Sequence, residues 1–243
     1  MNCPKMVLFD YGHTLVHEKS YDALAGYEAV LRHAVCNPDH VNAQTLAHAY
    51  EKWRAPMDRA VVGAEYEIPA LLYDRAVYDA LGLTFDCTLQ ELELERWNAS
   101  IPYEAMPGIG QLLAHLTARG IRTGVISNLS FSQESLRARI EAVIPDAPFE
   151  FYIASSDYGY RKPFGILFEI ACRKAGLSAK DIFFCGDNAR ADVLGAMQAG
   201  MTPVWYCPPV SCFYRAAGED IPPAGEFVRI RHWDELARLI DTL

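Results

Sequence analysis

Four side chains that suit phosphoryl transfer stand just after apolar runs of this 243-residue chain. Asp10, Ser127 and Asp187 each follow a short apolar run, and Lys162 lies in the loop after a weaker one. Two carboxylates, a hydroxyl and an ammonium are each poor catalysts alone. Together they can hold a divalent cation and a phosphoryl group, so this set predicts phosphoryl chemistry.

Each of these side chains has a distinct charge to balance. Asp10 and Asp187 offer the hard oxygen ligands that Mg²⁺ prefers. With the metal offsetting repulsion, Asp10 can attack phosphorus and form an aspartyl-phosphate. Ser127 and the backbone N–H groups after it would hold phosphoryl oxygens, while Lys162 would neutralise the transferring group. Asp192 follows Asp187 in the same segment and is predicted to orient a metal-bound water or the lysine.

The elements that must position these residues are parallel strands alternating with helices. Apolar runs bounded by turn residues are typical of buried parallel strands, and apolar residues at helical spacing predict the helices between them. The predicted strands cover 6–9, 123–126, 151–153, 182–185, 203–206 and 227–230, and the predicted helices cover 109–119, 165–175, 192–199 and 233–243. This alternation predicts an α/β fold with a Rossmann-like, doubly wound parallel sheet. Ligands bind such sheets beyond the carboxyl ends of the strands, which gathers residues far apart in sequence into one crevice.

Residues 17–100 have a different pattern, without a run typical of a strand. Their apolar residues recur every three or four positions in four stripes, within 23–35, 46–53, 71–81 and 89–97. We therefore expect an all-helical cap domain at 17–100 and a Rossmann-like catalytic core made of 1–16 and 101–243. The prolines and glycine of 100–108 break the helical pattern where the chain returns, and 207–226 is expected to be a long surface loop.

The composition narrows the range of partners. Asp and Glu number 31 against 22 for Lys and Arg, which gives a net charge of −9 with no cluster of basic residues. Such a chain repels nucleic-acid backbones and anionic lipid headgroups, so neither nucleic acid nor a membrane is an expected partner. We expect a cytoplasmic protein, from the absence of a leader-like start and the scattered cysteines. The sequence leaves the oligomeric state open.

Four segments resemble the motifs of a known superfamily in order and spacing. They are Asp10-Tyr11-Gly12-His13-Thr14-Leu15, Ser127-Asn128, Arg161-Lys162-Pro163 and Gly186-Asp187-Asn188-Ala189-Arg190-Ala191-Asp192. In this the chain resembles the haloacid dehalogenase (HAD) superfamily, in particular its phosphoglycolate-phosphatase-like branch with a helical cap. The resemblance implies a Mg²⁺-dependent hydrolase of a small phosphorylated metabolite, with Asp10 as nucleophile, Lys162 as the second catalytic residue and a cap that closes over the crevice.

The resemblance also implies the remaining site residues. The metal ligands would be Asp10, Asp187, Asp192 and the backbone carbonyl of Gly12. The substrate would be bound by Thr14, Ser127, Asn128 and Arg161.

Gly12 departs from the pattern of the family's phosphatases. These have a second aspartate at that position, which protonates the leaving alcohol and then activates water. Losing a general acid/base costs about 10² to 10⁴ in rate.

Three explanations of Gly12 stay open. The first is a phosphatase that is weak or uses another acid, such as His13. The second is a phosphonatase-like C–P hydrolase that forms a Schiff base through Lys19 or Lys52, and the third is a catalytically weak protein that binds a phosphorylated metabolite. The intact Gly186, Asp187 and Asp192 disfavour a metal-free dehalogenase. We favour the phosphatase.

Overall fold

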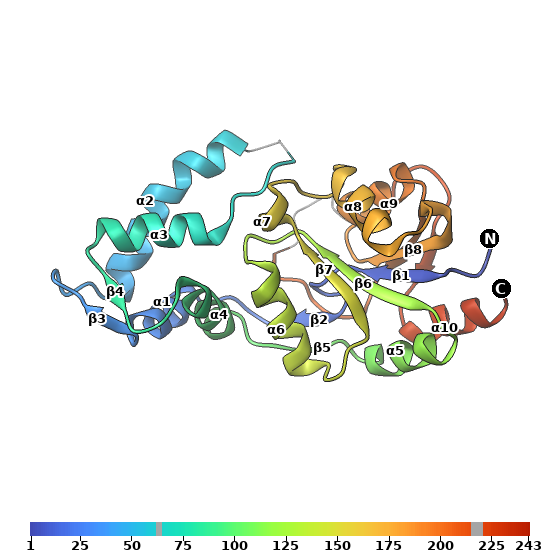
Figure 1. The fold of residues 1–243 in the computed structure, drawn as a ribbon, viewed down its shortest axis with the longest axis horizontal. Helices are drawn as coiled ribbons and strands as arrows, with labels where there is room; N and C mark the ends of the chain where they lie inside the picture. Colours follow the sequence, from blue (N-terminus) through green and yellow to red (C-terminus); the bar gives the residue numbers. More distant parts are fainter. Residues whose placement is uncertain (62–64, 215–220) are drawn as a thin grey trace.

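A six-stranded parallel sheet forms the centre of the core. In this computed structural model, which describes residues 1–61, 65–214 and 221–243, the strand order is β10-β9-β8-β1-β6-β7 (Figure 1). The strands are β1 (Met6–Phe9), β6 (Arg122–Ser127), β7 (Phe149–Ala154), β8 (Ile182–Gly186), β9 (Thr202–Tyr206) and β10 (Val228–Ile230). Chain order reverses beside β1, which pairs in parallel with both β6 and β8. This confirms the predicted doubly wound sheet and puts its switch point at the end of β1.

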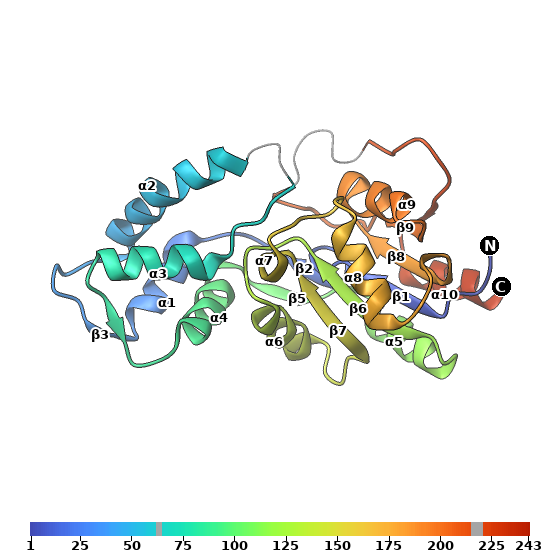
Figure 2. The ribbon, with the colours of Figure 1, turned by 45° about the horizontal axis from the view of Figure 1, so that its top comes forward.

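Helices cover both faces of this sheet because its strands are apolar on both sides. Val7 and Phe9 face α5 (Ile109–Ala118), α6 (Gln133–Val143) and α10 (Trp233–Asp241), whereas Met6 and Leu8 face α8 (Ile166–Ala175) and α9 (Gly195–Gln198) (Figure 2). Two short helices complete the core, α7 (Ser155–Tyr158) and the 3₁₀ turn Ala179–Asp181. The predicted helix 192–199 instead begins as the wider π-turn Ala189–Leu194.

Four helices make the cap, which extends to one side of the sheet (Figure 1). They are α1 (Ala23–Leu31), α2 (Ala43–Val61), α3 (Ala70–Ala80) and α4 (Leu89–Ser100), packed around their own apolar and tyrosine-rich cluster. The cap also contains one antiparallel pair, β3 (Ala34–Cys36) with β4 (Thr84–Phe85). The prediction of only helices missed this pair, because strands of two or three residues are too short to show alternation.

A second antiparallel ribbon joins the cap to the core. β2 (Val16–Glu18) pairs with β5 (Tyr103–Ala105), so β2 spans the predicted boundary at 16/17, whereas β5 begins shortly after the one at 100/101. Arg139 of α6 lies fully buried against this ribbon, where its guanidinium donates to the Ile101 carbonyl and stacks on the Tyr103 ring. Arg139 is therefore a buried cation bound to the ribbon through which the chain enters and leaves the cap.

No helix in the described parts of the chain combines the length and the apolar character needed to cross a bilayer.

Candidate active site

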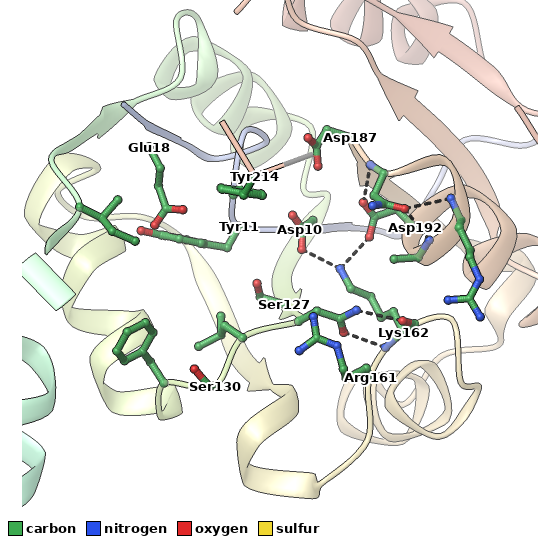
Figure 3. Close-up of a pocket in the computed structure, with 18 of the residues that line it drawn as sticks. Asp10, Tyr11, Glu18, Ser127, Ser130, Arg161, Lys162, Asp187, Asp192 and Tyr214 are labelled. Carbon is green, nitrogen blue, oxygen red and sulfur yellow. Dashed lines mark hydrogen bonds and ion pairs between the residues drawn. The ribbon is translucent and has the colours of Figure 1, made fainter. Parts of the chain in front are cut away.

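The carboxyl ends of β1, β6 and β8 open into a cavity of about 450 Å³ (Figure 3). It is lined by Asp10, Tyr11, Gly12, Glu18, Trp97, Ile101, Ser127, Asn128, Leu129, Ser130, Phe131, Arg161, Lys162, Asp187, Asn188, Arg190, Ala191, Asp192 and Tyr214. Asp10, Ser127 and Asp187 each follow or end one of these strands, as the sequence predicts. The parallel topology thus brings together side chains that lie more than 170 positions apart in the chain.

Lys162 is the buried cation at the centre of this cavity. Its Nζ donates to Asp10 Oδ1 at 2.6 Å, Asp192 Oδ1 at 2.7 Å and the Ile126 carbonyl at 2.9 Å. All three ammonium hydrogens are therefore used. Burial alone would lower the pKa of Lys162, but the charges of Asp10 and Asp192 outweigh it and raise the pKa above its ordinary value. The lysine stays charged and has one orientation.

The amide of Asn128 fixes the chain that carries this lysine. Asn128 Oδ1 accepts from the Lys162 backbone N–H at 2.7 Å, and Nδ2 donates to the Lys162 carbonyl at 2.9 Å. Both polar ends of the amide are occupied by the main chain. The Asn128 side chain thus positions Lys162, and its predicted contact with substrate stays a prediction.

A group of three carboxylates lies next to the Lys162 ammonium. Asp10, Asp187 and Asp192 each offer an oxygen, and these oxygens lie within 4.8 Å of one another. Asp192 uses one oxygen for Lys162 and the other to accept from the Asn188 N–H at 2.9 Å, and burial raises its pKa. Three hard oxygen donors around one point are a donor set that fits Mg²⁺.

Gly186 permits this close arrangement. A Cβ at Gly186 would lie only 2.3 Å from the Asp192 carboxylate, so any larger residue would displace Asp192. Asn188 then starts the π-turn, since its side-chain oxygen accepts from the N–H groups of Arg190 and Ala191. The segment from Gly186 to Asp192 is a tight turn that aims Asp187 and Asp192 at β1.

A family model and individual relatives match this chain. The model of the haloacid dehalogenase-like hydrolases matches residues 4–200, most of the chain. The chain belongs to the haloacid dehalogenase-like hydrolase family.

Two relatives within this family match shorter stretches. A glyceraldehyde 3-phosphate phosphatase of Methanothermobacter thermautotrophicus is 30% identical over 101 residues, which is 40% of this chain and 42% of the relative. A 5-amino-6-(5-phospho-D-ribitylamino)uracil phosphatase of Escherichia coli is 33% identical over 60 residues, 25% of each protein. The matched part therefore spans less than half the length of either relative.

Solved structures of the family resemble this chain over almost its whole length. A 2-haloacid dehalogenase from Pseudomonas syringae pv. tomato DC3000 gives a TM-score of 0.61 at 21% identity, over 98% of this chain and 99% of that one. A predicted phosphoglycolate phosphatase from Haemophilus somnus 129PT gives 0.56 at 19% identity, over 98% and 99%. At these identities the likeness shows the fold and nothing about the reaction.

Two side chains, those of Tyr214 and Glu18, lie next to Gly12 in the cavity. A Cβ at Gly12 would lie 2.4 Å from the Tyr214 hydroxyl and 4.0 Å from Glu18 Oε2. The space of the missing carboxylate is thus bordered by a phenol and by another carboxylate (Figure 3). His13 has a left-handed φ of 52° and is fully buried, with its ring against His17 and Tyr214. It is not among the described residues that line the cavity.

Two other predicted substrate-binding residues differ in position. Thr14 is fully buried and does not line the cavity among the residues described, so a direct contact of its side chain with substrate is not supported. Arg161 lines the cavity, and its guanidinium is bound to Glu67 from the cap. The lysines considered for a Schiff base, Lys19 and Lys52, are exposed and are not among the described lining residues.

The sequence analysis did not identify Glu18, Ser130 or Tyr214 as lining residues. Glu18 stands in a three-residue strand and Tyr214 outside any described helix or strand, and neither has a spacing to a strand end that would indicate the crevice. Only the departure at Gly12 could have suggested a search for another acid.

Proposed function

We propose that this protein is a Mg²⁺-dependent phosphatase of a small phosphorylated metabolite, acting through an aspartyl-phosphate on Asp10. The observation that carries this proposal is the hydrogen-bonded row from Asp10 through Lys162 to Asp192, with Asp187 beside it. The buried Lys162 ammonium donates a hydrogen bond to Asp10 and so orients the proposed nucleophile. Such an arrangement suits attack on an electrophile that itself carries negative charge.

The charge of the cavity supports the need for a divalent cation. Its described lining includes four carboxylates against three cations, and two of those cations, Arg161 and Arg190, are already paired with Glu67 and Glu65 of the cap. A phosphate dianion would be repelled by this lining unless a cation offset the charge. Asp10, Asp187 and the Gly12 carbonyl would hold Mg²⁺. Asp192 holds Lys162 and the Asn188 N–H and would help to organise the metal.

When bound, Mg²⁺ would supply charge neutralisation for the phosphoryl group. The chain's own residues do the rest. Asp10 presents a carboxylate oxygen to phosphorus, Ser127 lines the cavity beside it to hold a phosphoryl oxygen, and Lys162 offsets the charge of the pentavalent transition state (Figure 3).

A second cavity of about 380 Å³ supports a substrate with a body beyond its phosphate. It lies between the cap helices and the core loop of Ser130 and Phe131, and it shares Ile101, Ser130 and Phe131 with the first cavity, so the two adjoin. Tyrosine hydroxyls and the ion pair Arg96–Asp74 line it, which favours a neutral polar or ring-containing group. The named activities of both curated relatives concern small phosphorylated metabolites. We propose the cytoplasm as the location, on the odd number and scattered positions of the seven cysteines.

The direct test is release of inorganic phosphate from a panel of small phosphate esters and phosphonates, with and without Mg²⁺. The Asp10→Asn variant serves as the blank. We expect Mg²⁺-dependent release from phosphate esters that Asp10→Asn abolishes. Release from phosphonates alone would favour the C–P hydrolase, and no release from any compound while Mg²⁺ still binds would favour a binding protein.

A further inference from the structure

The cavity contains one carboxylate that the proposed function leaves without a role. Glu18 stands on β2, outside all four motifs, and is 6% exposed. It lines the cavity together with Asp10 and Gly12. We propose that Glu18 is the general acid and base of the reaction, taking over the proton transfers that Gly12 cannot perform. This inference rests on the proposed function and extends it.

The position of Glu18 relative to Gly12 is the main support. Glu18 Oε2 lies 4.0 Å from where a Cβ of residue 12 would be. The carboxylate oxygens of an aspartate extend roughly 2.4 Å beyond its Cβ, from ordinary bond lengths near 1.5 Å. Measured from that Cβ position, Glu18 Oε2 therefore lies only about 2 Å farther away than the carboxylate oxygens of an aspartate would. The longer side chain on the next strand reaches the same part of the cavity.

The surroundings of Glu18 let it carry a proton. Burial raises its pKa above the ordinary value, and the nearby charge of Asp10 adds to this, although Arg139 and hydrogen bonds from Tyr11 and Trp97 oppose the shift. Arg139 faces Glu18 Oε1 at 3.4 Å, whereas Oε2 is the oxygen on the Gly12 side. Oε1 thus faces the Arg139 guanidinium, and Oε2 faces the cavity.

Two neighbouring groups are less suited to the same task. Tyr214 places its hydroxyl nearer to Gly12, but loss of solvation raises the pKa of this phenol well above its ordinary value. It can donate a hydrogen bond but would not give up and regain a proton near neutral pH. His13 is buried behind Tyr214 and is not among the described residues that line the cavity.

The proton balance of the cycle then closes within the site. As an Asp10 oxygen bonds to phosphorus and the bond from phosphorus to the ester oxygen breaks, the Glu18 carboxylic acid gives its proton to the leaving oxygen, which departs as the alcohol. The resulting Glu18 carboxylate takes a proton from water while that water attacks phosphorus. The bond from Asp10 to phosphorus breaks, phosphate leaves, and both side chains return to their starting states.

A matched pair of substrates tests this assignment. 4-Nitrophenyl phosphate and 4-nitrobenzyl phosphate have similar shapes, but the phenolate leaves without a proton and the benzyl alkoxide does not. With the Mg²⁺-loaded enzyme in excess, single-turnover release of each leaving group reports the first step alone. In Glu18→Gln we expect alcohol release from the benzyl ester to fall by about 10² to 10⁴. Release of 4-nitrophenolate should fall by less than about tenfold, because that step needs no acid.

Matched variants separate proton transfer from a structural role. Glu104→Gln makes the same change at an exposed site on β5 of the same ribbon, and both rates should stay at the wild-type values. Glu18→Asp keeps a carboxylate for Arg139 but withdraws it from the cavity, so it should give the same selective loss if Glu18→Gln does not fold.

Several outcomes would overturn the assignment. An equal loss with both esters would mean that Glu18 only positions the ribbon and Arg139. A selective loss in Tyr214→Phe rather than in Glu18→Gln would make the phenol the acid. Failure of the wild-type enzyme to release either leaving group with Mg²⁺ would instead refute the proposed phosphatase, and this inference with it.

Discussion

The core and the cap bury polar groups in different ways. In the core, both faces of the sheet are apolar, and the charged side chains of the site lie where the strands end. In the cap, an ion pair lies inside the helix bundle, where Asp74 accepts two hydrogen bonds from Arg96 at 2.9 and 3.0 Å and one from Tyr50 at 2.5 Å. The core therefore concentrates charge at one edge for chemistry, while the cap encloses a neutralised, polar interior beside it.

From this difference we expect the core to carry out catalysis and the cap to select the substrate. The charges of the core sit on strand ends that the parallel topology brings together, so their arrangement depends on the sheet. The polar groups of the cap sit on three different helices and line the second cavity, so their arrangement depends on the packing of those helices. We expect substitutions in the core site to change turnover and substitutions in the cap interior to change stability and the choice of substrate.

The largest effect is expected in the core. Asp10→Asn removes the proposed nucleophile but leaves Lys162 bound to Asp192 and the Ile126 carbonyl, so the fold should persist. Turnover of a phosphate ester should fall at least ~10⁴-fold, or about 5.5 kcal/mol. Asp181→Asn, on the turn before β8 at the opposite end of the sheet, is the matched control and should keep wild-type turnover. Residual turnover within tenfold of the wild type would exclude an aspartyl-phosphate on Asp10.

The next effect is expected in the cap interior. Asp74→Asn leaves the buried Arg96 without its counter-charge, and breaking a buried pair on one side costs about 3–5 kcal/mol. Urea unfolding measures the loss, and hydrogen exchange should locate it in α3 and α4 rather than in β6. Asp79→Asn, exposed on the same helix, should change the stability by less than about 0.5 kcal/mol. Equal stabilities of the two variants would show that the ion pair has no net stabilising role.

A smaller effect on stability is expected when a glycine in a helix of either region is replaced by alanine. A Cβ on Gly26 of α1 would lie 2.0 Å from Ser100 Oγ and 2.9 Å from the Arg96 carbonyl, so Gly26→Ala forces α1 away from α4. We expect a loss of about 1–3 kcal/mol in thermal or urea unfolding. Gly110→Ala on α5 meets open space and should instead stabilise the core by about 0.4–1 kcal/mol. A neutral Gly26→Ala would mean that the two cap helices can separate without cost.

The smallest effect is expected where cap and core touch. Glu67 accepts hydrogen bonds from Arg161 and from Ser155 Oγ at 2.7 Å. Arg161 is 39% exposed, so the pair contributes at most about 1 kcal/mol. Glu67→Gln should raise KM for a phosphate ester by about fivefold or less, with little change in kcat and a smaller difference at high salt. Glu95→Gln, exposed on α4, is the control, and a change in kcat alone would contradict a role in closing the cap.

The sheet could be predicted from the sequence because its strands show a recognisable pattern of apolar residues. The central strands β1, β6 and β8 contain apolar runs that end at a polar residue or glycine, and β1 with Asp10 and β6 with Ser127 appear where expected. The β3–β4 pair could not be predicted, since its strands are too short to carry a period. The two hydrogen bonds of Asn128 to the Lys162 backbone could not be predicted either, since the position of Asn128 in a motif does not reveal them.

The sequence by itself determined the class of fold and predicted the members of the hydrogen-bonded row of Asp10, Lys162 and Asp192. Strand periodicity is local, and parallel topology then collects strand ends without further information. Only the tertiary structure decided what each side chain does there. The three hydrogen bonds of Lys162, the pairing of Arg161 with Glu67 and the approach of Glu18 to Gly12 join residues from separate elements. Such contacts depend on the packing distances between elements, which no spacing along the chain encodes.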